Sequence, residues 1–151
     1  MYITALTLHS YVRWLVLLIM IGALIRAWWG LLGKRQWARA DDWLTIAFTW
    51  AISLQFLLGV VLYLIPDGLA AVARLDFGAA MKTRELRFFG LEHPLQMFIA
   101  IGIIHLGSAR ARKARPSARQ FRWAAICFTT SALLILIAVP WWRPFFRGLG
   151  W

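Results

Sequence analysis

Four ionisable side chains lie at the beginnings of two apolar segments. At these positions they could bind a cofactor or transfer protons near a membrane surface. His9 and Arg13 lie at the start of the first segment, and Glu92 and His93 lie at the start of the third. Charged and imidazole groups are costly at membrane depth, so each one is a candidate functional group. Two neutral imidazoles from two helices can ligate a haem iron axially, while Arg13 pairs with a propionate. Alternatively, a histidine and a carboxylate can accept the protons of a quinol.

The elements that must position these groups are transmembrane helices. The chain contains four apolar segments, at about 8–32, 43–65, 91–108 and 123–142. Each approaches the ~20 residues that a helix needs to cross a bilayer. Backbone groups in hydrocarbon must be satisfied within the segment, which favours helices. The sequence therefore predicts an all-α protein, an integral membrane four-helix bundle that forms a single domain over 1–151. The mixed segment 69–77 is expected to form a short interfacial helix.

The basic residues predict the orientation of this bundle. The first and third connectors are rich in Lys and Arg, and short loops of this kind favour the cytoplasmic side. The basic residues concerned are Lys34, Arg35, Arg39, Arg110, Arg112, Lys113, Arg115, Arg119 and Arg122. Both termini and the long second connector should then lie outside. Asp41 and Asp42 are expected to begin the second helix as N-terminal capping acids. With this topology the first and third helices run in the same direction, so the four candidate residues should lie at similar depth near the outer surface.

A purely structural role is the alternative for the same cluster. In that case Arg13 and Glu92 form an ion pair at the outer boundary, with His9 and His93 hydrogen-bonded nearby. His105 lies about 18 Å further along the third helix than His93, so it cannot join the same ligand set. It is expected at the interface or in a hydrogen bond between helices.

Several uncharged residues are predicted at helix contacts. Gln55 lies near mid-membrane in the second helix, and amides at such depth usually hydrogen-bond to a neighbouring helix. Glycine has no side chain, so it lets two helix backbones approach closely, and small residues are enriched at membrane helix interfaces. The glycines expected in this role are Gly22, Gly59 and Gly102. These residues are expected to be structural.

Composition narrows the functional class. The chain has 151 residues, of which 62% are hydrophobic, and a formal net charge of +11. Such a charge often indicates nucleic-acid binding in a soluble protein, but here the basic residues lie mainly between apolar segments, so nucleic acid is not an expected partner. The single cysteine, Cys127, excludes an intrachain disulfide. The expected location is the bacterial cytoplasmic (inner) membrane, with several crossings and with lipids as partners.

Short motifs along most of the chain carry a family resemblance. They are Leu8-His9-Ser10-Tyr11-Val12-Arg13-Trp14-Leu15, Gln55-Phe56-Leu57-Leu58-Gly59, Leu62-Tyr63, Glu92-His93-Pro94 with Met97, His105-Leu106-Gly107 and Pro140-Trp141-Trp142-Arg143-Pro144. In these motifs the chain resembles a group of small bacterial four-helix membrane proteins that are loosely labelled cytochrome b-like. Its architecture is also similar to that of accessory subunits of the quinol-oxidising alternative complex III.

The resemblance and the few reactive groups together favour one function. The expected function is that of a non-catalytic accessory subunit of a respiratory or photosynthetic electron-transfer complex, with no cofactor of its own, other membrane subunits as partners and a quinone as a further contact. The alternative is a single-haem b-type cytochrome in which His9 and His93 bind haem b, supported by Arg13 and Glu92. A small transporter is a weaker alternative. The aromatic and basic tail over 141–147 is expected to dock on another protein or to anchor in lipid.

Overall fold

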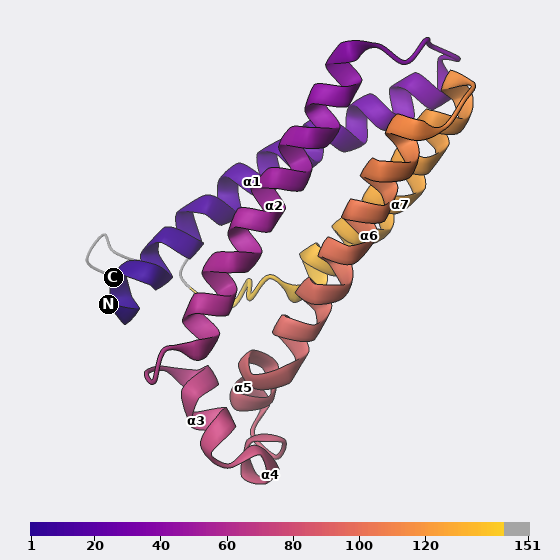
Figure 1. Ribbon diagram of the computed structural model, residues 1–151. Coiled ribbons are helices and arrows are strands. Elements are labelled where there is room, and N and C mark those ends of the chain that lie inside the picture. The colour runs from indigo at the N-terminus through magenta and orange to yellow at the C-terminus, as the bar shows by residue number, and fades with distance from the viewer. Residues whose placement is uncertain (144–151) are drawn as a thin grey trace.

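The computed structural model describes residues 1–143, which form helices joined by short connectors (Figure 1). The four long helices are α1 (Tyr2–Leu32), α2 (Arg39–Leu64), α6 (His93–Lys113) and α7 (Ser117–Ala138). The short elements are α3 (Leu69–Leu75), α4 (Phe77–Ala80), α5 (Arg84–Arg87) and the π-helix η1 (Phe88–Glu92). Residues 144–151 hold the second half of the predicted docking tail and lie outside the described residues.

Four helical spans are long and apolar enough to cross a membrane, namely α1, α2, the run Arg84–Lys113 and α7. They are arranged as a ring in which α1 contacts α2 and α7, while α6 contacts the same two helices (Figure 1). Successive spans alternate in direction. For residues 1–143 the prediction of an all-α protein with four helices long and apolar enough to cross a membrane is therefore confirmed, and the side on which the termini lie stays a prediction.

Small residues set the closest helix contacts. A Cβ on Gly107 would overlap the Cys127 side chain, so α6 and α7 approach each other closely at this level. A Cβ on Gly30 would likewise overlap the ring of Phe121, where α1 meets α7. Two of the glycines that we predicted at helix contacts do not have this role, because nothing lies within 4 Å of the Cβ position of Gly22 or Gly102.

Helix boundaries differ from the predicted ones for local reasons. The second helix begins at Arg39 rather than at residue 43, because Asp41 sits in its first turn and accepts a 2.8 Å hydrogen bond from the Ala38 backbone N–H. The fourth helix ends at Ala138 rather than at 142, because the residue before Pro140 is extended. At the opposite end, α6 continues to Lys113 and α7 begins at Ser117, which shortens the third connector to residues 114–116.

The segment between α2 and α6 forms a compact cap on one end of the bundle (Figure 1). The single helix predicted over 69–77 is divided into α3 and α4 at Asp76, whose backbone is extended and whose carboxylate accepts a 2.9 Å hydrogen bond from the Ala79 N–H. A Cβ on Gly90 would overlap the side chain of Ala73, so α3 packs directly on η1. The cap therefore fixes the start of the third span from the side.

A π-helical turn leads into α6 because of Pro94. Proline has no N–H and its ring clashes with the carbonyl four residues earlier, here that of Gly90. The wider turn of η1 relieves this clash, and the His93 N–H bonds to the Phe88 carbonyl five residues back. The Tyr63 hydroxyl of α2 donates a 3.1 Å hydrogen bond to the Gly90 carbonyl, which receives no N–H from Pro94. The turn thus places His93 at the first position of a helix whose start is held by two neighbouring elements.

Candidate functional site

His9 and His93 meet inside the capped end of the bundle. His9 comes from the second turn of α1 and His93 from the start of α6. Their ring centres are 6.4 Å apart, and the ring planes make an angle of 77°. Two side chains that are far apart in the sequence therefore face one site, as the topology predicted from the basic residues requires.

The orientation of His93 is set by the end of α7. Its Nδ1 lies 2.8 Å from the carbonyl oxygen of Ala138, the last residue of that helix. The final carbonyls of a helix have no partner within the helix, so this one is available to accept. A carbonyl can only accept, so Nδ1 carries the proton and Nε2 of the neutral ring keeps its lone pair. This is the arrangement in which metal-bound histidines are commonly held by an outer partner.

The backbone at His9 is held by α2. The Gln55 amide nitrogen donates a 2.9 Å hydrogen bond to the His9 carbonyl, which confirms the predicted contact of Gln55 between helices. The imidazole lies over Gly59, whose Cβ position would be 3.3 Å from His9 Cε1. Glycine therefore leaves just enough room for this ring, and a larger residue would displace it.

Two buried polar atoms at this place lack a hydrogen-bond partner among residues 1–143. They are His9 Nδ1 and Gln55 Oε1. A buried polar atom that stays unsatisfied costs about 1–3 kcal/mol, so it calls for an additional group. Both residues line one cavity, and that cavity is the natural place for such a group.

This cavity has a volume of about 520 Å³ and lies between α1, α2, η1, α6 and the end of α7. Its walls are mostly apolar, with Phe56, Met97, Phe98 and Ile135 among them. The polar groups that face it come from a few residues, including both histidines, Gln55 and Arg13. A mainly apolar cavity of this size with a few converging polar groups is typical of small-molecule and cofactor sites.

The charged members of the predicted cluster separate. Arg13 lines the cavity, and its guanidinium lies 5.5 Å from the centre of the Trp14 ring. Glu92 instead accepts a 2.7 Å hydrogen bond from Arg87 Nε, five residues earlier, and both side chains are about 40% exposed. Among the described residues, Arg87 rather than Arg13 thus forms the ion pair with Glu92. The ion pair expected from the sequence is wrong, because helix geometry places a closer cation on the same segment.

Arg143 lines the cavity although sequence reasoning did not select it. Its guanidinium stacks on the Phe89 ring at 4.6 Å and lies 3.5 Å from the Glu85 carboxylate. The chain turns back after Pro140, where the Arg143 N–H bonds to the Pro140 carbonyl at 3.0 Å. The only signal in the sequence was its place in the Pro140–Pro144 motif.

His105 stays apart from this site, as its position along the third helix predicted. Its Nδ1 lies 2.9 Å from the Ile101 carbonyl within α6, and its Nε2 lies 3.4 Å from the Ser53 hydroxyl of α2. It makes a local bond and a contact between helices, and its ring is exposed. His105 is therefore a useful internal control for the two histidines of the cavity.

The two imidazoles lie in one cavity with their ring centres 6.4 Å apart, close enough for both to contact a single bound group. The lone pair on His93 Nε2 and the unsatisfied Nδ1 of His9 are both chemically suited to bind or orient such a group.

Comparison of the chain with known protein families, with curated proteins and with solved structures gives no match. The residues of the cavity are therefore the basis for assigning a function. The main features of the cavity are the paired imidazoles, the backbone carbonyl that orients one of them, and the apolar walls around both.

Proposed function

We propose that this chain is a membrane electron-transfer protein in which His9 and His93 ligate a single b-type haem. The observation that supports the proposal best is the 6.4 Å separation of the two ring centres within a cavity between helices. The haem, when bound, would supply reversible one-electron transfer through its iron. The remaining contributions come from the protein.

Each residue of the cavity has a distinct part in this proposal. The Ala138 carbonyl keeps the proton of His93 on Nδ1 and leaves Nε2 as the ligand atom. Gln55 holds the α1 backbone at His9, and Gly59 leaves the space that the His9 ring occupies. Arg13 offers positive charge for a propionate, because guanidinium groups pair well with carboxylates.

The protein environment would also tune the bound group. The apolar side chains of the cavity limit access of water, which affects the redox potential of such a centre. Histidine ligands also differ in basicity according to their outer partners, so the hydrogen bond from His93 to Ala138 would strengthen that ligand.

A single one-electron site requires partners that deliver and remove electrons. The proposal therefore includes association with other membrane subunits of an electron-transfer complex, as in the function expected from the sequence. A purely structural accessory subunit, without haem, stays a prediction that the experiment below separates from a cytochrome.

The decisive experiment is an absorbance spectrum of the protein purified in mild detergent after expression with a haem precursor. We expect a Soret band, an α band in the reduced-minus-oxidised spectrum and about one haem per chain by pyridine haemochrome assay. His9→Ala and His93→Ala should each abolish these bands, because each removes one ligand. His105→Ala is the matched control and should retain them, since its ring lies outside the cavity.

A second pair of measurements tests whether the variants remain folded. Circular dichroism and gel filtration should show unchanged helicity and size for all three variants. His93→Gly should regain the bands when free imidazole is added, because imidazole can occupy the space left by the side chain. Wild-type protein without haem, or bands that survive His9→Ala, would refute the cytochrome proposal. Co-purification in mild detergent with larger subunits then tests the association by itself.

A further inference from the structure

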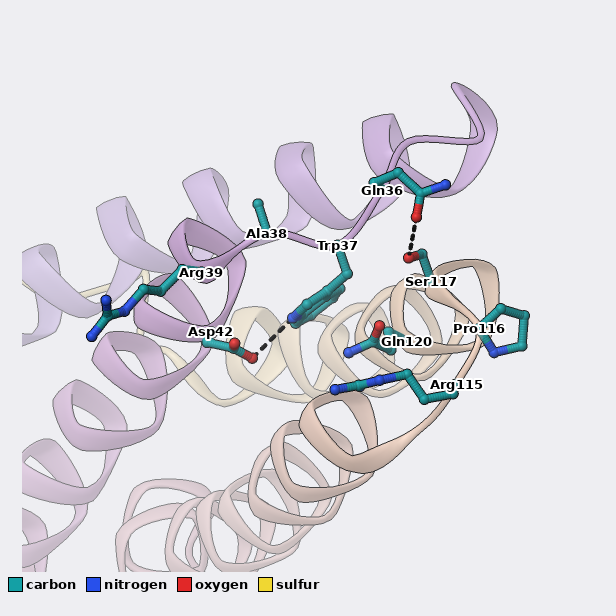
Figure 2. Close-up of a pocket in the computed structure, with 9 residues that line it drawn as sticks. All are labelled: Gln36, Trp37, Ala38, Arg39, Asp42, Arg115, Pro116, Ser117 and Gln120. Atoms are coloured by element: carbon teal, nitrogen blue, oxygen red, sulfur yellow. Dashed lines mark hydrogen bonds between the residues drawn. The ribbon is translucent and has the colours of Figure 1, made fainter.

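A second cavity lies at the opposite end of the bundle, where the α1–α2 connector meets the start of α7 (Figure 2). Its volume is about 720 Å³, and its walls combine polar side chains with apolar surface from residues such as Trp37 and Pro116. Trp37 and Asp42 form one side, and Arg115, Ser117 and Gln120 form the other. This site uses none of the residues of the histidine cavity.

Gln120 is the first sign that this cavity binds a ligand. The residue is only 3% exposed, and it lines the cavity between Trp37 and Arg115 (Figure 2). Its side-chain amide makes no hydrogen bond to any of the residues that the structure describes. Its polar atoms are not among the buried atoms that lack a partner, so the amide is open to the cavity, where water or a ligand can bond to it. The amide nitrogen of Gln120 is a donor that an oxygen-rich group in the cavity would satisfy.

The start of α7 adds further donors. Pro116 is the N-cap residue, and neither a side-chain cap nor an acidic residue is present in the first turn of this helix. The Arg119 and Gln120 N–H groups bond to the Pro116 carbonyl, which leaves those of Ser117 and Ala118 at the helix start, where the helix dipole favours negative charge. The Ser117 hydroxyl is turned toward the connector, where it donates a 2.9 Å hydrogen bond to Gln36 (Figure 2). The helix start therefore meets the cavity as an anion-binding terminus.

Charge at this end of the bundle has the sign that such a ligand requires. The Arg115 guanidinium lies beside Gln120 (Figure 2), and its Nη1 is bonded to the carbonyl of Ala114 at 2.7 Å, which leaves its other N–H groups available. Asp42 is the opposing negative charge, and it accepts a 2.9 Å hydrogen bond from Trp37 Nε1. Nine Lys and Arg residues surround this end, against Asp41 and Asp42. They are Lys34, Arg35, Arg39, Arg110, Arg112, Lys113, Arg115, Arg119 and Arg122.

We propose that this cavity binds the phosphate of an anionic membrane lipid. Arg115, the Gln120 amide and the uncapped start of α7 together supply the donors that a phosphodiester needs. The cavity lies where four apolar spans end, which is the depth at which lipid phosphates are held. Basic pockets between transmembrane helices bind anionic headgroups by the same physics. A lipid is favoured over free phosphate because its chains lie along the exposed apolar helix faces.

The test uses full-length protein that has been exchanged into neutral detergent, with short-chain phosphatidylglycerol as the probe. Native mass spectrometry should show that phosphatidylglycerol is retained more strongly than phosphatidylcholine of the same chain length. Arg115→Gln should weaken this retention about fivefold, the effect of removing one cation near a lipid surface. Lys113→Gln is the matched control, because it removes one positive charge at the same end without lining the cavity.

Gln120→Glu is a second variant that tests the cavity without removing an arginine. The change is close to isosteric and places a negative charge against the phosphate, so retention should fall at least as much as in Arg115→Gln. Unchanged helicity and monodispersity confirm that the variants are folded. Equal retention of both lipids by wild-type protein would overturn the proposal, as would equal losses in Arg115→Gln and Lys113→Gln. Displacement of the lipid by millimolar inorganic phosphate would identify a free anion as the ligand and also overturn it.

Discussion

The ion pair between Arg26 and Asp41 offers the sharpest test of how this bundle is held together. Arg26 Nε lies 2.5 Å from one carboxylate oxygen of Asp41, and Arg26 Nη2 lies 3.1 Å from the other. The pair joins α1 to the first turn of α2. The Asp41 side chain is 2% exposed, whereas that of Arg26 is 26% exposed. This difference in exposure predicts that the two single substitutions will have unequal effects.

Arg26→Gln should be the more harmful change. It leaves the Asp41 carboxylate buried without its cation, and removal of one partner from a buried pair costs about 3–5 kcal/mol. Since Arg26 is partly exposed and Asp41 keeps its bond to the Ala38 N–H, we expect a loss of about 2–3 kcal/mol in the free energy of unfolding. Asp41→Asn should cost about 1 kcal/mol, because Arg26 can extend toward the headgroups and asparagine can still accept from Ala38.

The assay is reversible unfolding in mixed micelles with increasing sodium dodecyl sulfate, followed by circular dichroism. Lys113→Gln is the control, since it removes an exposed positive charge and should change stability by less than about 0.5 kcal/mol. The double variant should lose about 1–2 kcal/mol less than the sum of the single ones, because the two side chains interact directly. Equal losses in Arg26→Gln and Lys113→Gln would refute the reasoning, and so would a larger loss in Asp41→Asn than in Arg26→Gln.

Two further predictions concern the start of α6 and its contact with α7. Tyr63→Phe should cost about 1 kcal/mol of stability, because it removes the donor to the Gly90 carbonyl. The loss of stability should be much smaller in a Pro94→Ala background, because the restored backbone N–H at position 94 can bond to the Gly90 carbonyl in place of the Tyr63 hydroxyl. Equal losses in the two backgrounds of this double-mutant cycle would contradict our account of η1. Gly107→Ala should destabilise the protein by about 1–3 kcal/mol through overlap with α7, whereas Gly102→Ala should be neutral or slightly stabilising. Micelle unfolding measures both, and similar effects at the two glycines would show that the bundle relaxes around Gly107.

The sequence was sufficient to predict the four long helices, because their cause is local. A membrane core imposes helices on any apolar segment of sufficient length, so the four spans follow from composition and length alone. Alternation of direction then places His9 and His93 at the same end, since both begin odd-numbered spans. Even the separation of His105 follows from the rise of a helix.

Two kinds of sequence prediction were wrong. One was the choice of ion-pair partner for Glu92, and the other was the choice of glycines that lie at helix contacts. Arg87 lies on the same helical run as Glu92 and forms an ion pair with its carboxylate, so Glu92 is not paired with Arg13 as the sequence predicted. Gly22 and Gly102 have the same composition signal as Gly107, but only the last faces a neighbouring helix. The rotation of each helix about its long axis determines which glycine faces a neighbour. This rotation cannot be predicted from the hydrophobic pattern, because the spans are apolar both toward lipid and toward the neighbouring helices.

What the sequence by itself determined is the presence of four helices long and apolar enough to cross a membrane and the gathering of two histidines at one end. What only the tertiary structure decided is that these two imidazoles face each other across 6.4 Å, with the Ala138 carbonyl fixing the proton of one and Gln55 fixing the backbone of the other. These contacts join segments that are distant in the chain, and their geometry depends on where α7 ends and how α1 and α2 are rotated. Local propensity carries no information on either quantity, because both are settled by the mutual packing of all four helices.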